Sequence, residues 1–214
     1  MTRTAASEIV SYIRQNRVST TEVADCLEKT GVLPRVLPVS QGKFAVGEVV
    51  LAVAYEESNW PVHEKIQDVP PGAVVVIESI GCGERAIIGD LVAKYLTLYR
   101  ESSAVVVNGN VRDAPRLLRE RWPVWATGFN PVGCWNTKPR KPAPPDPIAL
   151  LEEKYRNAVA VCDDSGVVVI PDGRIGPEFL EKLKAMELQE DQWYECIDRR
   201  KWNTFETVCL RAYE

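Results

Sequence analysis

Two pairs of neighbouring residues, Gly89-Asp90 and Arg112-Asp113, are the strongest candidates for chemistry in this sequence. Each pair follows a short run of β-forming residues, and open α/β proteins bind ligands where their strands end. Asp113 offers hard oxygen ligands that suit Mg²⁺ or Mn²⁺. Arg112 offers a planar fork for a carboxylate or another oxyanion. The two pairs together predict a site for a small anionic molecule.

Each pair also has an ordinary structural explanation. Asp90 can cap the helix that it begins, and Arg112 with Asp113 can form a local ion pair in a surface turn. A helix that starts here would nevertheless leave the amides of Leu91 and Val92 without backbone partners. Such amides attract a carboxylate or a phosphate, so the functional interpretation depends on the two pairs meeting in the fold.

The elements that must position these residues alternate between helix and strand, which predicts an α/β fold. Helices are predicted over 7–16, from a Ser-x-x-Glu capping box at Ser19, from Gly89, and over 115–121, 148–157 and 177–199. Strands are predicted within 44–55 and over 73–77, 104–107, 124–126, 159–161 and 167–170. Asn108-Gly109-Asn110 is predicted to be a turn, and Asp163 to Gly166 a hairpin turn.

Composition narrows the class of protein. The chain has 214 residues, which fits one domain over 1–214, with a proline-rich surface connection at 138–147 and a helical C-terminal segment over 177–214. The net charge of -4 argues against nucleic acid or an anionic membrane as the partner. One histidine, and six cysteines without a Cys-x-x-Cys pair, disfavour histidine-rich zinc sites, serine–histidine catalysis and a disulfide scaffold. With no apolar N-terminal leader, a cytoplasmic protein is expected.

The signature as a whole resembles the RraA-like superfamily, which includes the class II HMG/CHA aldolases that cleave 4-hydroxy-4-methyl-2-oxoglutarate and similar acids. The resemblance covers most of the chain. Its matching segments are Thr21 to Asp25, Pro71 to Val74, Gly89-Asp90, Asn108 to Asp113, Pro123 to Gly128 with Pro131, and Asp163 to Pro171.

The resemblance implies a central β-sandwich or barrel-like core ringed by helices. It also implies a homotrimer, possibly paired into a hexamer, with sites between subunits. Asp113 would hold Mg²⁺ or Mn²⁺ directly or through water, and Asp90 would orient waters on the metal. Arg112 would neutralise the enolate oxygen of pyruvate, and the amides of Leu91 and Val92 would receive the substrate carboxylate. The implied substrate is a small 2-oxo acid.

Two further carboxylates are implied to come from a neighbouring subunit. Asp25 matches the family's opening helix, and Glu190 on the final helix is the preferred second acid, with Glu187 as a rival. The structural alternative for both positions is a solvated helix face.

The sequence departs from the family pattern in three places. Leu91 to Val111 counts 21 residues, whereas the aldolases usually have 20 between the first aspartate and the arginine. An extra residue inside the helix would rotate Asp90 away, but one in the following loop would be harmless. The segment 134–157 lacks the usual glycine-rich hairpin, and Trp122, Trp125 and Trp135 crowd the neighbourhood. These departures put the substrate in question more than the fold.

Other charged and polar residues are predicted to be structural. Arg112, Arg116 and Arg119 have helical spacing, but in an acidic chain they fit a solvated helix face better than a nucleic-acid stripe. His63 is predicted to be structural or exposed.

The leading hypothesis is a divalent-metal-dependent lyase that acts on a small 2-oxo acid by aldol cleavage or decarboxylation. One alternative is a non-catalytic protein-binding regulator, because the superfamily also contains inhibitors of an RNA-degrading endonuclease. Members of that branch tend to lack the acid after the arginine, so Asp113 favours metal chemistry. Another alternative keeps the lyase scaffold but gives it a specialised biosynthetic substrate. A methyltransferase is disfavoured because no glycine-rich cofactor loop follows an early strand.

Overall fold

A computed structural model describes residues 4–213, which form one eight-stranded sheet with helices on both faces. The confirmed class is therefore α/β. The strands are β1 (Leu37–Pro38), β2 (Ala45–Tyr55), β3 (Val74–Ile80), β4 (Ala86–Ile88), β5 (Ala104–Val111), β6 (Val124–Phe129), β7 (Val159–Asp163) and β8 (Gly166–Ile170). The helices are α1 (Ala5–Asn16), α2 (Thr20–Cys26), α3 (Trp60–Lys65), α4 (Asp90–Lys94), α5 (Ala114–Glu120), α6 (Pro145–Tyr155) and α7 (Pro177–Tyr194).

The strand order is β1-β6-β5-β3-β2-β7-β8, and β4 pairs with β5 beside this path. The middle of the sheet is parallel: β2 pairs with β3, β3 with β5, and β5 with β6. Val74 to Ile77 of β3 and Ala104 to Val107 of β5 are continuous runs of buried apolar residues, as expected for parallel strands that are covered on both faces. The first part of β2 turns away to pair with the antiparallel β7–β8 hairpin, which confirms the predicted hairpin.

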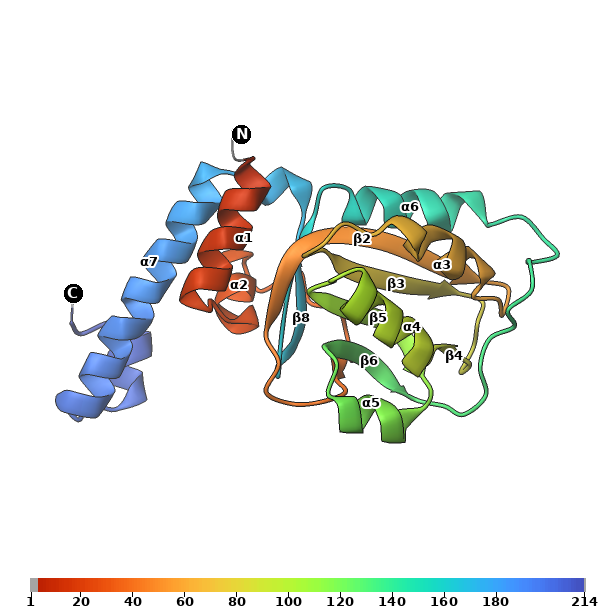
Figure 1. The fold of residues 1–214 in the computed structure, drawn as a ribbon. Helices are drawn as coiled ribbons and strands as arrows, with labels where there is room; N and C mark the ends of the chain where they lie inside the picture. Colours follow the sequence, from red (N-terminus) through yellow and green to blue (C-terminus); the bar gives the residue numbers. More distant parts are fainter. Residues whose placement is uncertain (1–3, 214) are drawn as a thin grey trace.

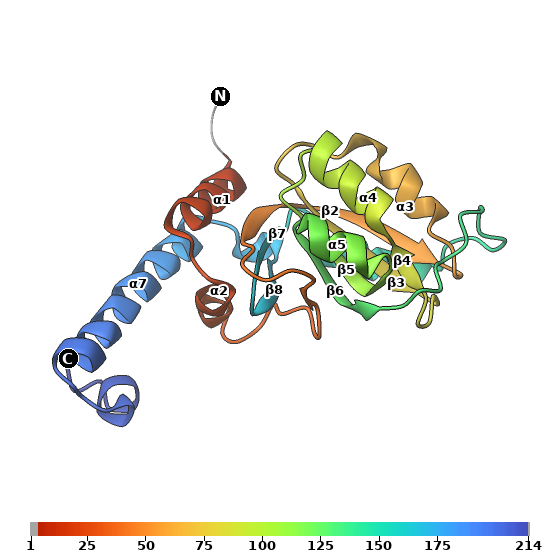
Figure 2. The ribbon, with the colours of Figure 1, turned by 60° about the horizontal axis from the view of Figure 1, so that its bottom comes forward.

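Helices cover the sheet from both sides (Figure 1). One face packs against α3, α4 and α5, and Val62, Leu96 and Leu117 belong to its buried cluster. The other face packs against α6, which contributes the buried Tyr155. Helices α1, α2 and α7 form a third buried cluster with β7 and β8, at the opposite end from β4 (Figure 2).

Local sequence signals account for the helix starts. Ser19 accepts the N–H of Glu22, and the Glu22 carboxylate accepts the N–H of Ser19, so the predicted capping box is confirmed. Pro145 begins α6, three residues before the predicted start at 148, because proline is tolerated in a first helical turn. The final helix follows its prediction closely: α7 continues through a π-helical turn, Glu195–Arg199. A second π-helical turn, Phe205–Cys209, follows, and short 3₁₀ turns lie at Ile66–Asp68 and Asp172–Arg174.

The predicted turn at Asn108-Gly109-Asn110 is wrong, because β5 continues through it to Val111. Tertiary contacts override the turn signal. The Asn108 amide donates to Glu78 Oε2 at 2.8 Å, and the Asn110 amide donates to the Glu84 carbonyl at 2.8 Å. Gly109 lies against Ile87, whose Cγ1 would be only 3.0 Å from an added Cβ. The pairing of β5 with β6 shifts register between Val107 and Asn110, so the strand passes through the Asn-Gly-Asn segment with a local irregularity and does not end there.

A π-helical turn, Tyr95–Tyr99, follows α4 directly. Such a wide turn accommodates one residue more than α-helical geometry. The 21-residue spacing does not turn Asp90 away, because the N–H of Asp90 still reaches Asp113. Within residues 4–213, no helix is long and apolar enough to cross a membrane.

Candidate functional site

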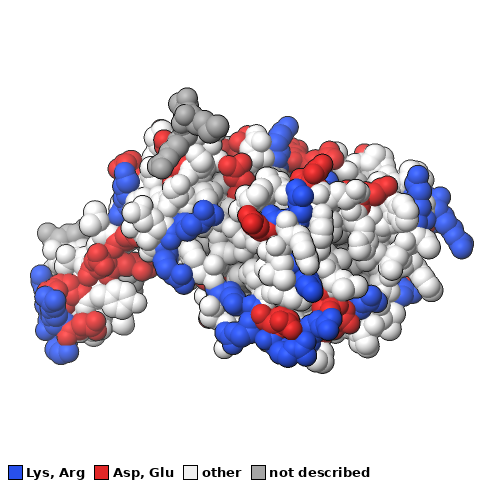
Figure 3. Space-filling model, in the orientation of Figure 1, with Lys and Arg blue, Asp and Glu red and all other residues white. Residues whose placement is uncertain are grey.

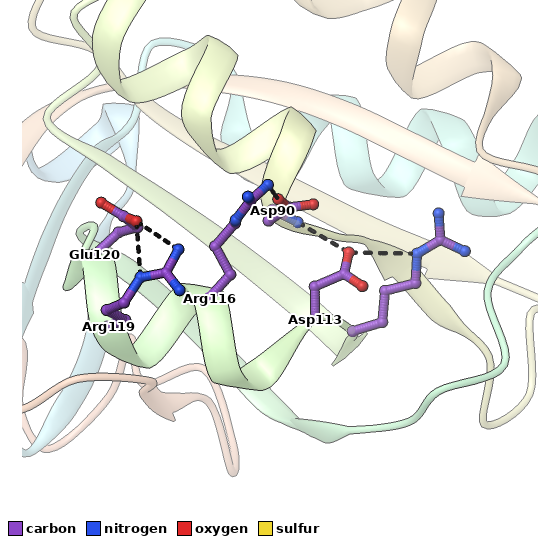
Figure 4. A network of polar contacts seen from close by, with 6 residues as sticks. Asp90, Asp113, Arg116, Arg119 and Glu120 are labelled. Carbon is purple, nitrogen blue, oxygen red and sulfur yellow. Dashed lines mark hydrogen bonds and ion pairs between the residues drawn. The ribbon is translucent and has the colours of Figure 1, made fainter.

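Asp90 and Asp113, 23 residues apart in the chain, meet where β4 and β5 end. The N–H of Asp90, the first residue of α4, donates to Asp113 Oδ2 at 3.2 Å (Figure 4). This approach depends on Gly89. A Cβ at Gly89 would lie 2.1 Å from Asp113 Oδ2, a distance that no side chain can occupy. The glycine of the Gly-Asp pair is therefore required because another carboxylate packs against it.

Arg112 and Asp113 are positioned by the end of β5. The N–H of Arg112 donates to the carbonyl of Ile88 at 3.0 Å, which ties the strand exit to β4. Asp113 then adopts a left-handed conformation, with φ of 60° and ψ of 36°. Aspartate tolerates this region better than most residues do. This left-handed conformation directs the Asp113 side chain towards the start of α4. The Asp113 carbonyl accepts the first backbone hydrogen bonds of α5, from Arg116 and Leu117.

Two guanidinium groups balance the two carboxylates. Arg116 Nη1 lies 2.7 Å from Asp90 Oδ2, and Arg112 Nε lies 3.6 Å from Asp113 Oδ2. The bond to Arg116, chiefly, holds the pKa of Asp90 below its usual range, although partial burial opposes this. Asp90 is therefore an anion at neutral pH. The end of Arg112 makes no hydrogen bond or ion pair with residues 4–213 apart from this contact, so it can receive an anion.

The predicted solvated helix face holds for Arg116 and Arg119, whose side chains on α5 are 54% and 66% exposed, but not for Arg112, which precedes the helix. Arg119 pairs with neighbouring Glu120, whereas Arg116, although exposed, reaches across to Asp90. Figure 3 shows the resulting mixture of positive and negative side chains near α5. No local signal pointed to the contact between Arg116 and Asp90, because these two lie 26 residues apart in the chain.

Asp90, Arg112 and Asp113 line one cavity of about 100 Å³, whereas Arg116 and Arg119 do not. Its walls come from α3, from β4 with the start of α4, from the exit of β5 and from the loop before α6. The lining residues are Asn59, His63, Ala86, Ile87, Ile88, Gly89, Asp90, Leu91, Val92, Arg112, Asp113, Gly133, Cys134 and Asn136. All five residues of the predicted primary site are therefore brought together. Trp122, Trp125 and Trp135 do not line this cavity.

Sequence reasoning missed the contribution of α3. His63 is exposed, as predicted, but it also lines the cavity, and desolvation lowers its pKa. Asn59 is 7% exposed; its amide donates to the Ile87 carbonyl, but its Oδ1 accepts nothing within residues 4–213. A buried acceptor without a partner is costly, so Asn59 is suited to a ligand that brings a donor. The only available sequence signal was that His63 is the chain's single histidine.

The loop before α6 closes the cavity over Arg112. Its residues Val132 and Cys134 exchange backbone hydrogen bonds with Ala86 of β4. This places Gly133 against the guanidinium, where an added Cβ would lie 2.6 Å from Arg112 Nη1. The segment that departs from the family pattern therefore builds one wall of the candidate site.

The carboxylates expected from a neighbouring subunit lie elsewhere in this chain. Asp25 forms an ion pair with Lys29, and Glu187 accepts a hydrogen bond from Tyr12. Burial raises the pKa of Glu190, and the charges of Glu22 and Asp25 raise it further. None of the three lines the cavity, so any role in the site requires a second subunit.

A divalent metal fits the donors that are present. Within residues 4–213, no three histidine, cysteine or acidic side chains form a closed metal site. Mg²⁺, however, is commonly bound through one or two carboxylates, and it keeps several waters or substrate oxygens. Asp113 uses Oδ2 for the contacts described above, and no hydrogen bond from residues 4–213 reaches its Oδ1. The pair Asp90 and Asp113 therefore suits an open Mg²⁺ or Mn²⁺ site.

Comparisons with known proteins agree with this architecture. The chain is 27% identical over 180 residues to Protein DlpA of Legionella pneumophila, and the match covers 80% of the chain but only 29% of that longer protein. It is 26% identical to a protein of Halalkalibacterium halodurans named "Putative 4-hydroxy-4-methyl-2-oxoglutarate aldolase", over 95% of the chain and 94% of the relative.

A solved structure has a similar fold over most of its length. Streptomyces coelicolor RraAS2, described as an unusual member of the RNase ES inhibitor RraA protein family, superimposes with a TM-score of 0.62 and 25% identity. The match covers 90% of this chain and 98% of that one. Finally, the family model described as "RraA-like: Aldolase/RraA" matches residues 20–169, and this chain therefore belongs to the RraA-like family.

Proposed function

We propose that the protein is a divalent-metal-dependent carbon–carbon lyase that cleaves or decarboxylates a small 2-oxo acid. The observation that carries the proposal is the convergence of Asp90, Arg112 and Asp113 on one small cavity. Such a site combines oxygen ligands for a hard cation with a guanidinium for an anionic substrate. The name of the full-length H. halodurans relative supports the same chemistry.

Asp113 would hold Mg²⁺ or Mn²⁺ directly or through water, and Asp90 would hold it through water. The bound metal would polarise the 2-oxo group and stabilise the negative charge that develops on its oxygen when the carbon–carbon bond breaks. A third and a fourth carboxylate, from Glu190 and Asp25 of a neighbouring subunit, would complete the site in a homotrimer.

The chain's own residues would bind and orient the substrate. Arg112 would place its positive charge beside the enolate oxygen of the departing pyruvate unit. The amides of Leu91 and Val92, at the start of α4, would receive the substrate carboxylate. Arg116 would keep Asp90 ionised and fixed in orientation.

A protein-binding regulator is the second candidate, because RraAS2 is described as a member of an RNase inhibitor family. The retained Asp113 favours the lyase, since a binding surface has no need for a carboxylate cradled against Gly89. A specialised biosynthetic substrate is compatible with the same mechanism. The loop before α6, which forms one cavity wall, is where such a specificity would be set.

Turnover of oxaloacetate tests the proposal. Purified protein with Mg²⁺ or Mn²⁺ is expected to release pyruvate, and a chelator is expected to abolish the reaction. Asp113→Ala should lower kcat/KM by about a hundredfold or more, because it would remove a ligand of the metal that stabilises the developing charge. Asp172→Ala, at an exposed turn outside the cavity, is the matched control. Turnover that is independent of metal and unchanged by Asp113→Ala would refute the lyase.

A further inference from the structure

Half of β2 forms an open edge of the sheet. Ala45 to Glu48 pair with β7 on one side, whereas Val49 to Tyr55 pair with β3 on the other. The N–H of Val49 still reaches the carbonyl of Ala158 at 2.8 Å, but the hairpin then leaves the strand. Beyond that point, no strand within residues 4–213 lies along the outer side of β2.

The direction of the backbone groups along this edge follows from their neighbours. The N–H groups of Val49 and Tyr55 point away from β3, to Ala158 and Ser58, whereas that of Glu56 points towards β3, to Ile80. Backbone groups alternate in direction along a strand. Leu51 and Val53 therefore each direct an N–H and a carbonyl outward, and nothing within residues 4–213 pairs with them.

A groove of about 450 Å³ runs along this edge. Its floor is Val49 to Val53 with Tyr55, and its sides are residues of α3 and α6. Two cations, Lys65 and Arg156, line it with a single carboxylate, Glu152. The groove therefore carries local positive charge in a molecule whose net charge is -4.

Helices α3 and α6, on either side of the groove, limit what can bind along the β2 edge. Helix α3 packs on one face of the sheet and α6 on the other, with β2 between them (Figures 1 and 2). The β2 edge of a second copy would bring its own α3 and α6 against these helices, so sheet-to-sheet pairing is obstructed. A single extended peptide segment has no helices on either side, so it is not obstructed in this way.

We propose that the open edge of β2 is a docking site for an extended acidic peptide segment of a partner protein, which adds to the sheet as a further strand. Its backbone would bond to Leu51 and Val53, as in other cases of strand addition. Alternate apolar side chains would lie beside Ile148 and Tyr155 of α6, and the acidic side chains between them would point to the opposite face, beside Lys65 of α3. This site is separate from the Asp90 cavity and does not depend on the lyase proposal.

Fluorescence anisotropy with a labelled heptapeptide, Thr-Val-Glu-Val-Glu-Val-Thr, tests the proposal. Saturable binding is expected, and it should be lost with a central proline and weakened when lysine replaces both glutamates. Val53→Pro should weaken binding about tenfold, because it deletes one outward donor and obstructs the edge. It removes no hydrogen bond to β3, and proline is tolerated at sheet edges, so the fold should persist.

Two further measurements make the outcome decisive even if Val53→Pro fails to fold. Lys65→Glu should weaken binding of the acidic peptide and strengthen binding of the lysine peptide. Hydrogen exchange at the amides of Leu51 and Val53 should slow when the acidic peptide is added to the wild-type protein. No saturable binding up to about 1 mM, which corresponds to only about 4 kcal/mol of affinity, would overturn the proposal. The proposal would also be overturned if binding left hydrogen exchange at both amides unchanged, or if Lys65→Glu left the peptide affinity unchanged.

Discussion

At the scale of single residues, the site is a balance of two acids and two arginines in which each acid has its own partner. Asp90 is held by Arg116, and Asp113 lies beside Arg112 and against Gly89. The sequence predicted that the acids would meet, because Gly-Asp and Arg-Asp both follow strands. It did not predict Arg116 as a partner, since an arginine on a helix is usually solvated, and only the fold brings α5 beneath α4.

The first residue-scale prediction concerns the charge of Asp90. Arg116 lowers its pKa, so the wild-type carboxylate stays ionised to a lower pH than a free aspartate would. In Arg116→Met this pKa should rise, and the acid limb of the pH profile of kcat/KM should move to higher pH. The loss of orientation should also lower kcat/KM at pH 7 by about tenfold, as is typical for residues that orient a ligand group. Arg119→Met, which breaks only the contact with Glu120, is the control. If the pH profile of kcat/KM of Arg116→Met superimposes on that of the wild type, Arg116 does not control the pKa of Asp90.

The second concerns Gly133. An alanine Cβ there would meet the flexible end of Arg112, so we expect the guanidinium to move while the fold persists. Gly133→Ala should lower oxaloacetate turnover by about tenfold to a hundredfold, because misplacing a reacting group has a large effect on rate. Gly173→Ala, where a Cβ would meet nothing within 4 Å, should leave turnover unchanged. Equal rates in both variants would mean that Arg112 needs no fixed position.

At the scale of elements, helix and strand types follow from local signals, but their ends follow from packing. The capping box at Ser19 and the Asp163–Gly166 hairpin were predictable because their signals are local. The continuation of β5 through Asn-Gly-Asn was not predictable, because Glu78, Glu84 and Ile87, far away in the chain, supply the partners that turn residues usually find in water. The π-helical turn after Asp90 has no recognisable local signal.

The prediction at this scale concerns α7. Burial and the neighbouring charges of α2 raise the pKa of Glu190, so the folded state favours its neutral form. Stability from a raised acid pKa is present at low pH and is lost as pH rises through the folded value. Glu190→Gln should therefore increase the urea midpoint at pH 7 but not at pH 4. Glu153→Gln, on the exposed face of α6, should change neither.

If Glu190 also serves a neighbouring subunit's site, Glu190→Gln should lower turnover while it stabilises the fold. Turnover that is unchanged in the more stable variant would exclude Glu190 from the site. The same assay on Glu187→Gln would then test the rival acid, whose hydrogen bond from Tyr12 gives it a structural role in this chain.

At the scale of the whole molecule, the three surfaces discussed above lie at different places around one curved sheet. The Asp90 cavity lies beside α4 and α5, the acids of α2 and α7 lie at the far end, and the open β2 edge runs between α3 and α6. The family, and the meeting of Asp90 with Asp113, were predictable from short segments because those segments touch each other. The wall built by Asn59, His63 and Gly133 was not, since these residues reach the cavity only through the packing of α3 and of the loop before α6.

The most direct test of the central claim is calorimetric titration of Mn²⁺ into the protein, in the presence of oxalate as a mimic of the pyruvate enolate. The wild-type protein should bind about one Mn²⁺ per chain, and Asp113→Asn should weaken that binding by tenfold or more, or about 1.4 kcal/mol. Asp172→Asn should bind as the wild type does. Equal Mn²⁺ affinity in the wild-type protein and Asp113→Asn, with or without oxalate, would contradict the account.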